Sequence, residues 1–304
     1  MRVTVIDVGS NSVLTTILDG WDVVFESSAV TGLGSGTRVS GVLAEDAMER
    51  TLSALRDGFA AAKEHGAERV AARATMAARI ASNTDAFLAR CAAQGTPVEV
   101  LSGEEEARLG LLSVAEDPAF GSEPRLSIVD VGGHSTELAT ADRVAGAWQA
   151  TFERSYPVGT LGLRGGALSA ESLSPSDLLQ GSAAIDEVIG LAYRPLECGT
   201  VVALGATGTN LVTIRERMRE WDPARVHGAV LEYEEVGRAA GWLGAMTDRE
   251  RAAVPGMERG RETTMHLGAL ILERFLFGLR AESCRVSTRG WRHALGAEIQ
   301  RVAR

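Results

Sequence analysis

Two short segments of the chain combine an aspartate with glycines and small polar residues. Residues 7–12 read Asp-Val-Gly-Ser-Asn-Ser, and residues 130–135 read Asp-Val-Gly-Gly-His-Ser. A glycine turn lets backbone N–H groups close around an anion, and a neighbouring aspartate can bind a hard cation such as Mg²⁺. Alone, either segment is explained as simply by a hairpin turn that the aspartate begins. Because the pattern occurs twice in matching surroundings, we expect two turns that bind a phosphate group and its metal ion.

The other positions of the two segments suit different roles. The residues that offer donors to an anion are Gly9, Ser10, Asn11, Ser12, Gly132, Gly133, His134 and Ser135. Glu137 follows the second segment and either reaches a metal ion or points outward from its strand. His134 could contact a substrate, although a single histidine in a turn is more often a solvated polar residue.

A third glycine-rich segment, residues 205–209, follows an apolar run at 201–204 and precedes a helix expected from about Asn210. Its candidate ligands are Gly205, Thr207 and Gly208. Amide groups at the positive end of a helix bind phosphate well. A packing turn with a threonine cap explains the segment equally well.

Glu106 is the candidate for chemistry on water. Ser102 and Glu105 form the capping-box pattern at a helix start, which gives Glu105 a structural role. Glu106 comes one residue later, on a helix face with Gly110, where space remains for water or a ligand. A carboxylate in that place can orient or deprotonate an attacking water, although acidic helix starts are common.

Arg79 lies between an expected strand and a helix that begins at Asn83 or Thr84. A guanidinium near a polyanion binds phosphate oxygens in a fork. A solvated arginine in a turn is the alternative, and without further context it is the simpler one.

The elements that must position these residues alternate between strands and helices. Each aspartate segment lies between two apolar runs, so each turn connects two strands. Further strands are expected at 69–74, 98–101, 144–152, 201–204 and 284–287, and helices at 44–65, 83–94, 102–115, 175–192, 210–220, 232–247, 261–280 and 290–304. This alternation predicts an α/β architecture. Residues 116–124 are polar and suit a linker, which places a domain boundary near residue 124.

Composition narrows the function classes. The 304 residues carry a net charge of −9, which argues against a nucleic-acid polymer as partner. No stretch approaches the length of a membrane span, and the chain starts with a strand pattern instead of a signal peptide. The three cysteines are far apart, as expected for reduced thiols. We therefore expect a cytoplasmic protein with no membrane partner.

Taken together and in this order, the motifs resemble those of the exopolyphosphatase and guanosine pentaphosphate phosphohydrolase family, within the actin/Hsp70/sugar-kinase superfamily. The matching stretches are residues 7–12, 74–79 with Asn83, 102–109, 129–138, 205–209 and 226–228 with Leu231. The chain departs from the family pattern at Gly-Gly-His in the second segment. Residues 287–294 match only part of the family's C-terminal motif.

The resemblance implies two ribonuclease-H-like (actin-like ATPase) lobes, residues 1–124 and 125–304, with an active-site cleft between them. Residues 288–304 remain open to packing back onto the first lobe. It implies that Glu106 is the catalytic carboxylate and that Asp130 and Glu137 hold Mg²⁺, with Mn²⁺ as an alternative. The implied phosphate-binding residues are Asp7, Gly9, Ser10, Asn11, Ser12, Arg79, Gly132, Gly133, His134, Ser135, Gly205, Thr207 and Gly208.

The expected function is therefore Mg²⁺-dependent release of terminal phosphate from inorganic polyphosphate. Short chains are favoured because the helical C-terminal domain of longer relatives is absent. Hydrolysis of the 5′-phosphate of pppGpp is an alternative within the family. A binding regulator of polyphosphate or nucleotides, without catalysis, is the alternative from another class. The expected partners are polyphosphate or guanosine polyphosphates, together with a second copy of the chain in a homodimer.

Overall fold

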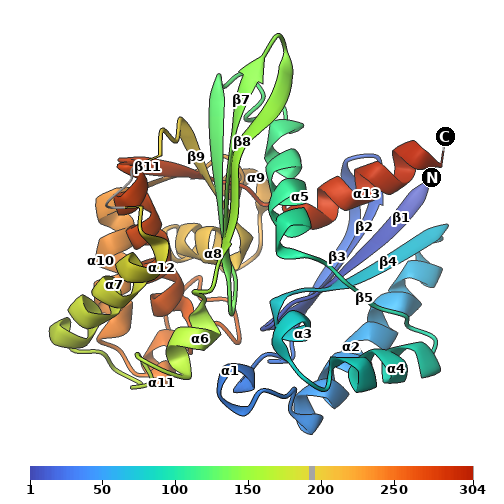
Figure 1. The fold of residues 1–304 in the computed structure, drawn as a ribbon, viewed down its shortest axis with the longest axis horizontal. Coiled ribbons are helices and arrows are strands. Elements are labelled where there is room, and N and C mark those ends of the chain that lie inside the picture. The colour runs from blue at the N-terminus through green and yellow to red at the C-terminus, as the bar shows by residue number, and fades with distance from the viewer. Residues whose placement is uncertain (192–195, 304) are drawn as a thin grey trace. The chain divides into compact units, whose positions relative to one another are not determined.

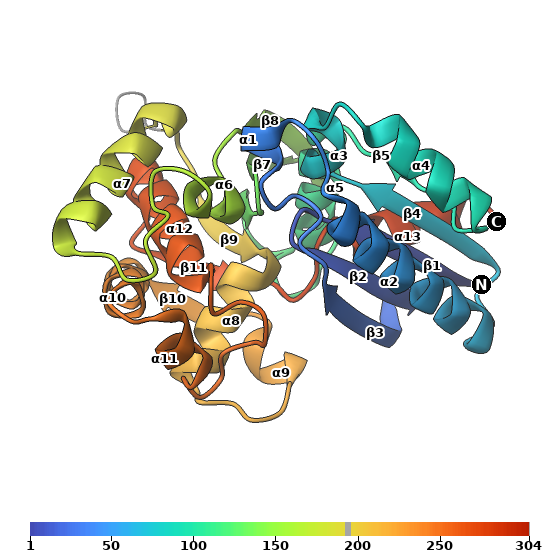
Figure 2. The same ribbon diagram turned by 90° about the horizontal axis from the view of Figure 1, so that it is seen from below.

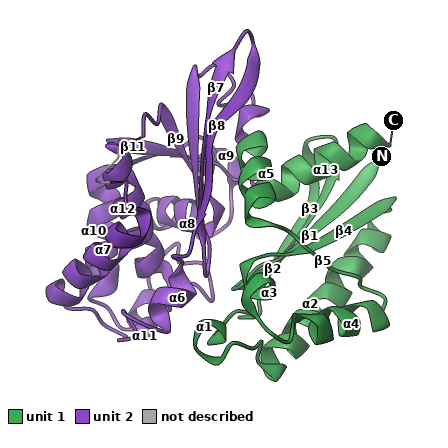
Figure 3. Cartoon of the chain, viewed as in Figure 1, with its two compact units in different colours: residues 1–113, 291–304 green, residues 114–290 purple. Residues whose placement is uncertain are grey.

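The chain forms two compact units in the computed structural model, which describes residues 1–191 and 196–303. Unit 1 contains residues 1–113 and 291–304, and unit 2 contains residues 114–290 (Figure 3). The chain therefore passes between the units twice. The first passage lies inside helix α5 (Gly103–Ala115), not near residue 124 as the sequence predicted.

The difference at the boundary has a physical reason. Residues 116–124 are polar in composition, yet Asp117 and Phe120 are buried. Asp117 Oδ2 lies 3.2 Å from both His227 Nε2 and Arg289 Nη1, which belong to unit 2. The segment that we expected to be a linker is thus part of the second unit.

Unit 1 is built on a five-stranded sheet. Its strands, in spatial order, are β3 (Asp22–Val30), β2 (Ser12–Asp19), β1 (Arg2–Val8), β4 (Arg69–Ala74) and β5 (Glu99–Val100). β2 runs antiparallel to β1 and β3, and β4 runs parallel to β1 and β5. The order 3-2-1-4-5 with an antiparallel second strand is the ribonuclease-H-like arrangement, so the α/β prediction is confirmed.

Helices cover both faces of this sheet (Figure 1 and Figure 2). The helices of this unit are α1 (Thr37–Ser40), α2 (Glu45–Glu64), α3 (Met76–Ile80), α4 (Thr84–Ala93), α5 and α13 (Trp291–Val302). Ile6 and Val8 pack with side chains of α2 and α4. Val3 and Val5 pack with side chains of α5 and α13. Because successive strand residues point to opposite faces, Asp7 belongs to the face that α5 and α13 cover.

Unit 2 repeats this plan. Its sheet has the order β10 (Val230–Glu232), β11 (Ser283–Val286), β9 (Thr200–Leu204), β6 (Arg125–Val131), β7 (Thr136–Val144) and β8 (Ala147–Tyr156). Read from β8, the first five strands again follow the order 3-2-1-4-5, and β10 adds an antiparallel edge.

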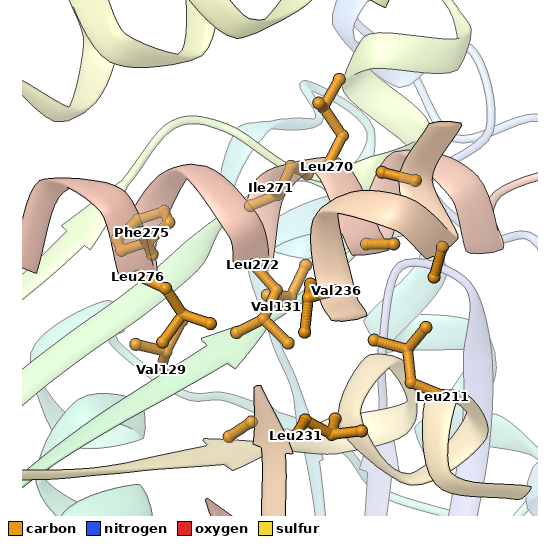
Figure 4. Close-up of a cluster of buried hydrophobic side chains, with 14 of the residues drawn as sticks. Val129, Val131, Leu211, Leu231, Val236, Leu270, Ile271, Leu272, Phe275 and Leu276 are labelled. Atoms are coloured by element: carbon orange, nitrogen blue, oxygen red, sulfur yellow. The ribbon is translucent and has the colours of Figure 1, made fainter. Parts of the chain in front are cut away.

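The helices of unit 2 enclose its main core. They are α6 (Thr160–Arg164), α7 (Pro175–Ile189), α8 (Gly205–Arg215), α9 (Pro223–Val226), α10 (Tyr233–Gly244), α11 (Asp248–Ala252) and α12 (Met265–Leu279). Figure 4 shows Val129 and Val131 of β6 among side chains of α12, with Leu211 and Leu231 nearby. Among the described residues, no helix is long and apolar enough to cross a membrane.

Candidate functional site

The first aspartate segment forms the turn between β1 and β2. The N–H of Gly9 donates to Ser12 O at 2.9 Å and closes the turn. Ser10 O accepts from the N–H of Gly34, and Asn11 O accepts from the N–H groups of Thr31 and Gly32. In a trans peptide the N–H points opposite to the carbonyl, so the Asn11 N–H faces away from residues 31–34. The Asn11 N–H group is therefore directed to the opposite side of the turn, where an anion could accept from it.

The side chain of Asn11 supports the same interpretation. Its Nδ2 atom is buried and has no hydrogen-bond partner among the described residues. A buried amide donor without a partner costs free energy, because water no longer satisfies it. An anionic oxygen bound in the turn would supply that partner. The predicted phosphate role of residues 9–12 therefore fits their geometry.

The second aspartate segment forms the corresponding turn between β6 and β7. The N–H of Gly132 donates to Ser135 O at 2.9 Å. Gly132 O accepts from Thr160, and Gly133 O accepts from Leu161 and Gly162, at the start of α6. By the same argument, the N–H groups of Gly133 and His134 face away from α6. His134 is buried, with 1% of its surface exposed, so the expectation of a solvated histidine is wrong.

Asp130 and Glu137 are direct partners across the antiparallel strands β6 and β7. Directly opposed residues point to the same face, so the two carboxylates are neighbours. Glu137 is buried and accepts a hydrogen bond from Ser155 Oγ at 2.7 Å. The sequence left open whether Glu137 points outward from its strand; its burial shows that it does not point into solvent.

Two neighbouring carboxylates are a suitable donor set for a hard divalent cation. Mg²⁺ usually takes one or two carboxylates and completes its shell with waters and substrate phosphates. Among the described residues there is no group of three or more His, Cys, Asp or Glu that could hold a metal by itself. Asp130 and Glu137 therefore fit Mg²⁺ or Mn²⁺ only as a partial shell that a phosphate would complete.

The third segment differs from its prediction. Residues 205–209 are the first turns of α8, which begins at Gly205, and not a loop before a helix starting at Asn210. Gly205 has φ +73°, and a Cβ there would lie 2.7 Å from Asp130 Oδ1. Gly205 is therefore beside the acidic pair, at the end of a strand parallel to β6.

Thr207 and Gly208 serve packing in this structure. Thr207 is buried, and its Oγ1 lies 2.5 Å from where a Cβ on Gly268 would stand. A Cβ on Gly208 would meet Ala203 Cβ at 3.1 Å. The packing alternative thus describes these two positions, and only Gly205 of this segment lies against Asp130.

Glu106 and Arg79 form an ion pair within unit 1. Arg79 Nη1 donates to Glu106 Oε2 at 2.9 Å and to Leu101 O at 2.7 Å. Their side chains are 17% and 12% exposed for Arg79 and Glu106, respectively. Burial raises the pKa of Glu106 above its ordinary value, and the Arg79 guanidinium opposes that rise. The solvated-turn alternative for Arg79 is therefore wrong.

The helix start places Glu106 as the sequence indicated. The N–H of Glu105 donates to Ser102 Oγ at 3.1 Å, which confirms the cap. The side chain of Glu105 pairs with Arg108 instead of reaching back to Ser102. Glu106 thus differs from its neighbour, because it is half of a largely buried ion pair on the helix that covers the Asp7 face.

One residue of the site was not predicted. Arg292, on α13, lies with its Nη1 3.8 Å from Asp7 Oδ2. The only signal for it was the partial match of residues 287–294 to the family's C-terminal motif. Local sequence patterns do not predict such a contact, because Asp7 and Arg292 lie near opposite ends of the chain.

Comparisons with known proteins agree along nearly the whole chain. The model of the Ppx/GppA phosphatase family matches residues 13–299. Exopolyphosphatase 2 of Mycobacterium tuberculosis is 30% identical over 296 residues, which cover 92% of this chain and 91% of that protein. The solved structure of the Aquifex aeolicus Ppx/GppA family member matches with a TM-score of 0.81 at 28% identity, covering 100% of this chain and 99% of that one. An exopolyphosphatase-like protein matches with a TM-score of 0.91 at 25% identity and covers 100% of both chains.

Proposed function

Because the chain belongs to the Ppx/GppA phosphatase family, we propose that it releases the terminal phosphate of short inorganic polyphosphate by Mg²⁺-dependent hydrolysis. The chain is a hydrolase that acts on phosphoanhydride bonds. The observation that supports the proposed hydrolysis of polyphosphate is the Arg79–Glu106 ion pair. It puts a largely buried carboxylate on α5, the helix that covers the sheet face to which Asp7 belongs.

Glu106 is the general base in this proposal. Arg79 binds Oε2 and fixes the plane of the carboxylate, so Oε1 is the atom that accepts a proton from water. A base is most effective when its pKa lies near the working pH, and burial moves the pKa of Glu106 in that direction. The reaction breaks the bond between the terminal phosphorus and its bridging oxygen, and the water oxygen takes its place.

Each of the two turns is a phosphate-binding element in this proposal. Donors from residues 9–12 and from residues 132–135 bind phosphate oxygens, as backbone amides do where negative charge develops. Asp130 and Glu137 would hold Mg²⁺, which neutralises charge on the phosphate oxygens when it is bound. Preorganised donors and charges supply most of the catalysis of phosphoryl transfer.

The test is an assay of phosphate release. The purified protein is incubated with tripolyphosphate, long-chain polyphosphate, pppGpp or ATP, each with Mg²⁺ or with EDTA. We expect Mg²⁺-dependent release that is fastest from tripolyphosphate. Fastest release from pppGpp would replace the proposed substrate by the family alternative, and no release from any substrate would favour a binding regulator.

The Glu106→Gln variant tests the base. The change is nearly isosteric, so we expect kcat to fall by about 10²–10⁴ while tripolyphosphate still binds. Glu105→Gln is the matched control, because its neighbouring carboxylate pairs with Arg108 at 3.4 Å on the exposed side of the helix. Equal losses of kcat in the two variants would remove Glu106 from its role.

A further inference from the structure

Helix α13 is held firmly against the sheet of unit 1. Trp291 and Leu295 pack with Val3 and Val5. A Cβ on Gly296 would lie 2.4 Å from Leu18 Cδ1, so the helix approaches β2 closely. Further along, the side-chain amide of Gln300 donates to Leu18 O at 3.2 Å. These contacts on both sides fix the backbone that carries residue 292.

Arg292 uses this position to reach three side chains on one face of the sheet. Its Nε donates to Thr16 Oγ1 at 2.9 Å, and its Nη2 donates to Glu26 Oε1 at 2.9 Å. Its Nη1 lies 3.8 Å from Asp7 Oδ2. The Arg292 side chain is only 11% exposed and that of Asp7 13%, so solvent screens this last pair weakly.

Local helix electrostatics do not account for an arginine here. Arg292 directly follows Trp291, the first residue of α13, and so it lies at the positive end of the helix dipole. A cation at that end is unfavourable, whereas a carboxylate would be stabilised. The first turn of α13 contains no acidic residue. The residue type is therefore explained by the tertiary contacts and not by helix formation.

We propose that Arg292 is a positioning residue for the first phosphate turn. Its guanidinium fixes the Asp7 carboxylate and compensates its negative charge, so that this turn accepts a phosphate group directly and not a divalent cation. This inference rests on the proposed function, because it assigns the phosphate end of the substrate to residues 7–12.

The charges of Asp7 and Arg292 explain why this turn is assigned to phosphate. A carboxylate beside a phosphate repels it, and in a largely buried place that repulsion is strong. A guanidinium next to the carboxylate removes most of the net charge and leaves the amide donors of the turn to act. The same guanidinium repels a divalent cation at Asp7, which leaves the acidic pair of the second turn as the better metal site.

The experiment measures binding of tripolyphosphate by calorimetry in the Glu106→Gln background, with EDTA and with Mg²⁺. Arg292→Gln should raise Kd by about tenfold under both conditions, as expected for loss of a charged contact. Arg292→Lys should recover part of the affinity. Glu26→Gln is the matched control, since it removes another carboxylate that Arg292 binds, and its Kd should stay within about twofold. With Glu106 intact, Arg292→Gln should raise KM more than it lowers kcat.

A reciprocal variant keeps the test decisive if Arg292→Gln folds poorly. In Asp7→Asn/Arg292→Gln the pair is neutral on both sides, so its Kd should return close to that of Asp7→Asn alone. Additive losses in the double variant, an unchanged Kd in Arg292→Gln, or an equal loss in Glu26→Gln would each overturn the inference. So would the absence of tripolyphosphate binding. Binding that depends on Arg292, with no phosphate release by the unmodified chain, would uphold the inference and reject the proposed function.

Discussion

The two aspartate turns share a backbone but not their surroundings. In each, a glycine N–H donates to a serine carbonyl at 2.9 Å, from Gly9 to Ser12 and from Gly132 to Ser135. In each, N–H groups of a later segment, residues 31–34 or residues 160–162, donate to carbonyl oxygens of the turn. The N–H groups of the same peptide bonds therefore point away from that segment. The repeated turn alone therefore predicts the same ligand chemistry in both places.

The two aspartates differ in the side chains that lie near them. Asp7 pairs in register with Leu14, and Arg292 approaches its carboxylate from α13. Asp130 pairs in register with Glu137, which adds a second carboxylate on the same face. We therefore propose that one backbone motif serves as a phosphate turn in unit 1 and as a cation site in unit 2, because its neighbours carry different charges.

Of the variants that compare the two turns, the one that breaks the acidic pair should have the largest effect. Asp130→Asn should lower Mg²⁺-dependent turnover by about 10²–10³, because charge on the phosphate would be poorly neutralised. Asp7→Asn should change KM by only about twofold, because it removes the negative charge that Arg292 compensates. Phosphate release measured against Mg²⁺ concentration should show a higher Mg²⁺ requirement in Asp130→Asn alone. The same Mg²⁺ shift in both variants would contradict the division between the turns.

The pH dependence of activity should show the effect of burial on Glu106. A base must be ionised, so kcat/KM falls as pH drops through the pKa of Glu106, which burial raises above its ordinary value of 4.5. Arg79→Leu removes the opposing guanidinium, so the acidic limb should move to higher pH. Stability changes in the opposite sense: because the pKa is raised in the folded state, the contribution of Glu106 to the unfolding free energy falls as pH rises above 4.5.

The control for this pH profile is Arg90→Leu, which removes an arginine of unit 1 that pairs with Glu45 and Glu49 on α2. Its acidic limb should coincide with that of the unmodified chain. An unmoved limb in Arg79→Leu would show that Glu106 is not the group that titrates.

The smallest expected effect concerns the support behind the second turn. A Cβ on Gly159 would lie 2.4 Å from His134 N, whereas one on Gly9 would meet Ser12 O only at 3.0 Å. Gly159→Ala should therefore lower the free energy of unfolding by about 1–3 kcal/mol, measured by urea denaturation. Gly241→Ala is the control, since nothing lies within 4 Å of its Cβ, and this helical substitution should stabilise the protein slightly. If Gly159→Ala is as stable as the unmodified chain, the backbone of the second turn can shift away from the added Cβ at little cost, and this prediction is wrong.

The sequence predicted what depends on local pattern. The turns, the Ser102 cap and most helices follow from glycine positions and apolar spacing within a few residues. It did not predict that α8 begins at Gly205, because glycine and threonine favour a loop in isolation. Nor did it predict the burial of His134 or the contact of Arg292 with Asp7, which depend on packing between segments far apart in the chain.

The packing of α13 in unit 1 has a consequence for folding during protein synthesis. Unit 2 occupies one continuous stretch, residues 114–290, whereas unit 1 needs the last residues of the chain. A nascent chain emerges N-terminus first, so unit 2 can finish folding on the ribosome while the first turn still lacks Arg292. A chain that stalls before residue 291 therefore lacks the guanidinium that lies beside Asp7 in the completed protein, even when its second unit is already folded.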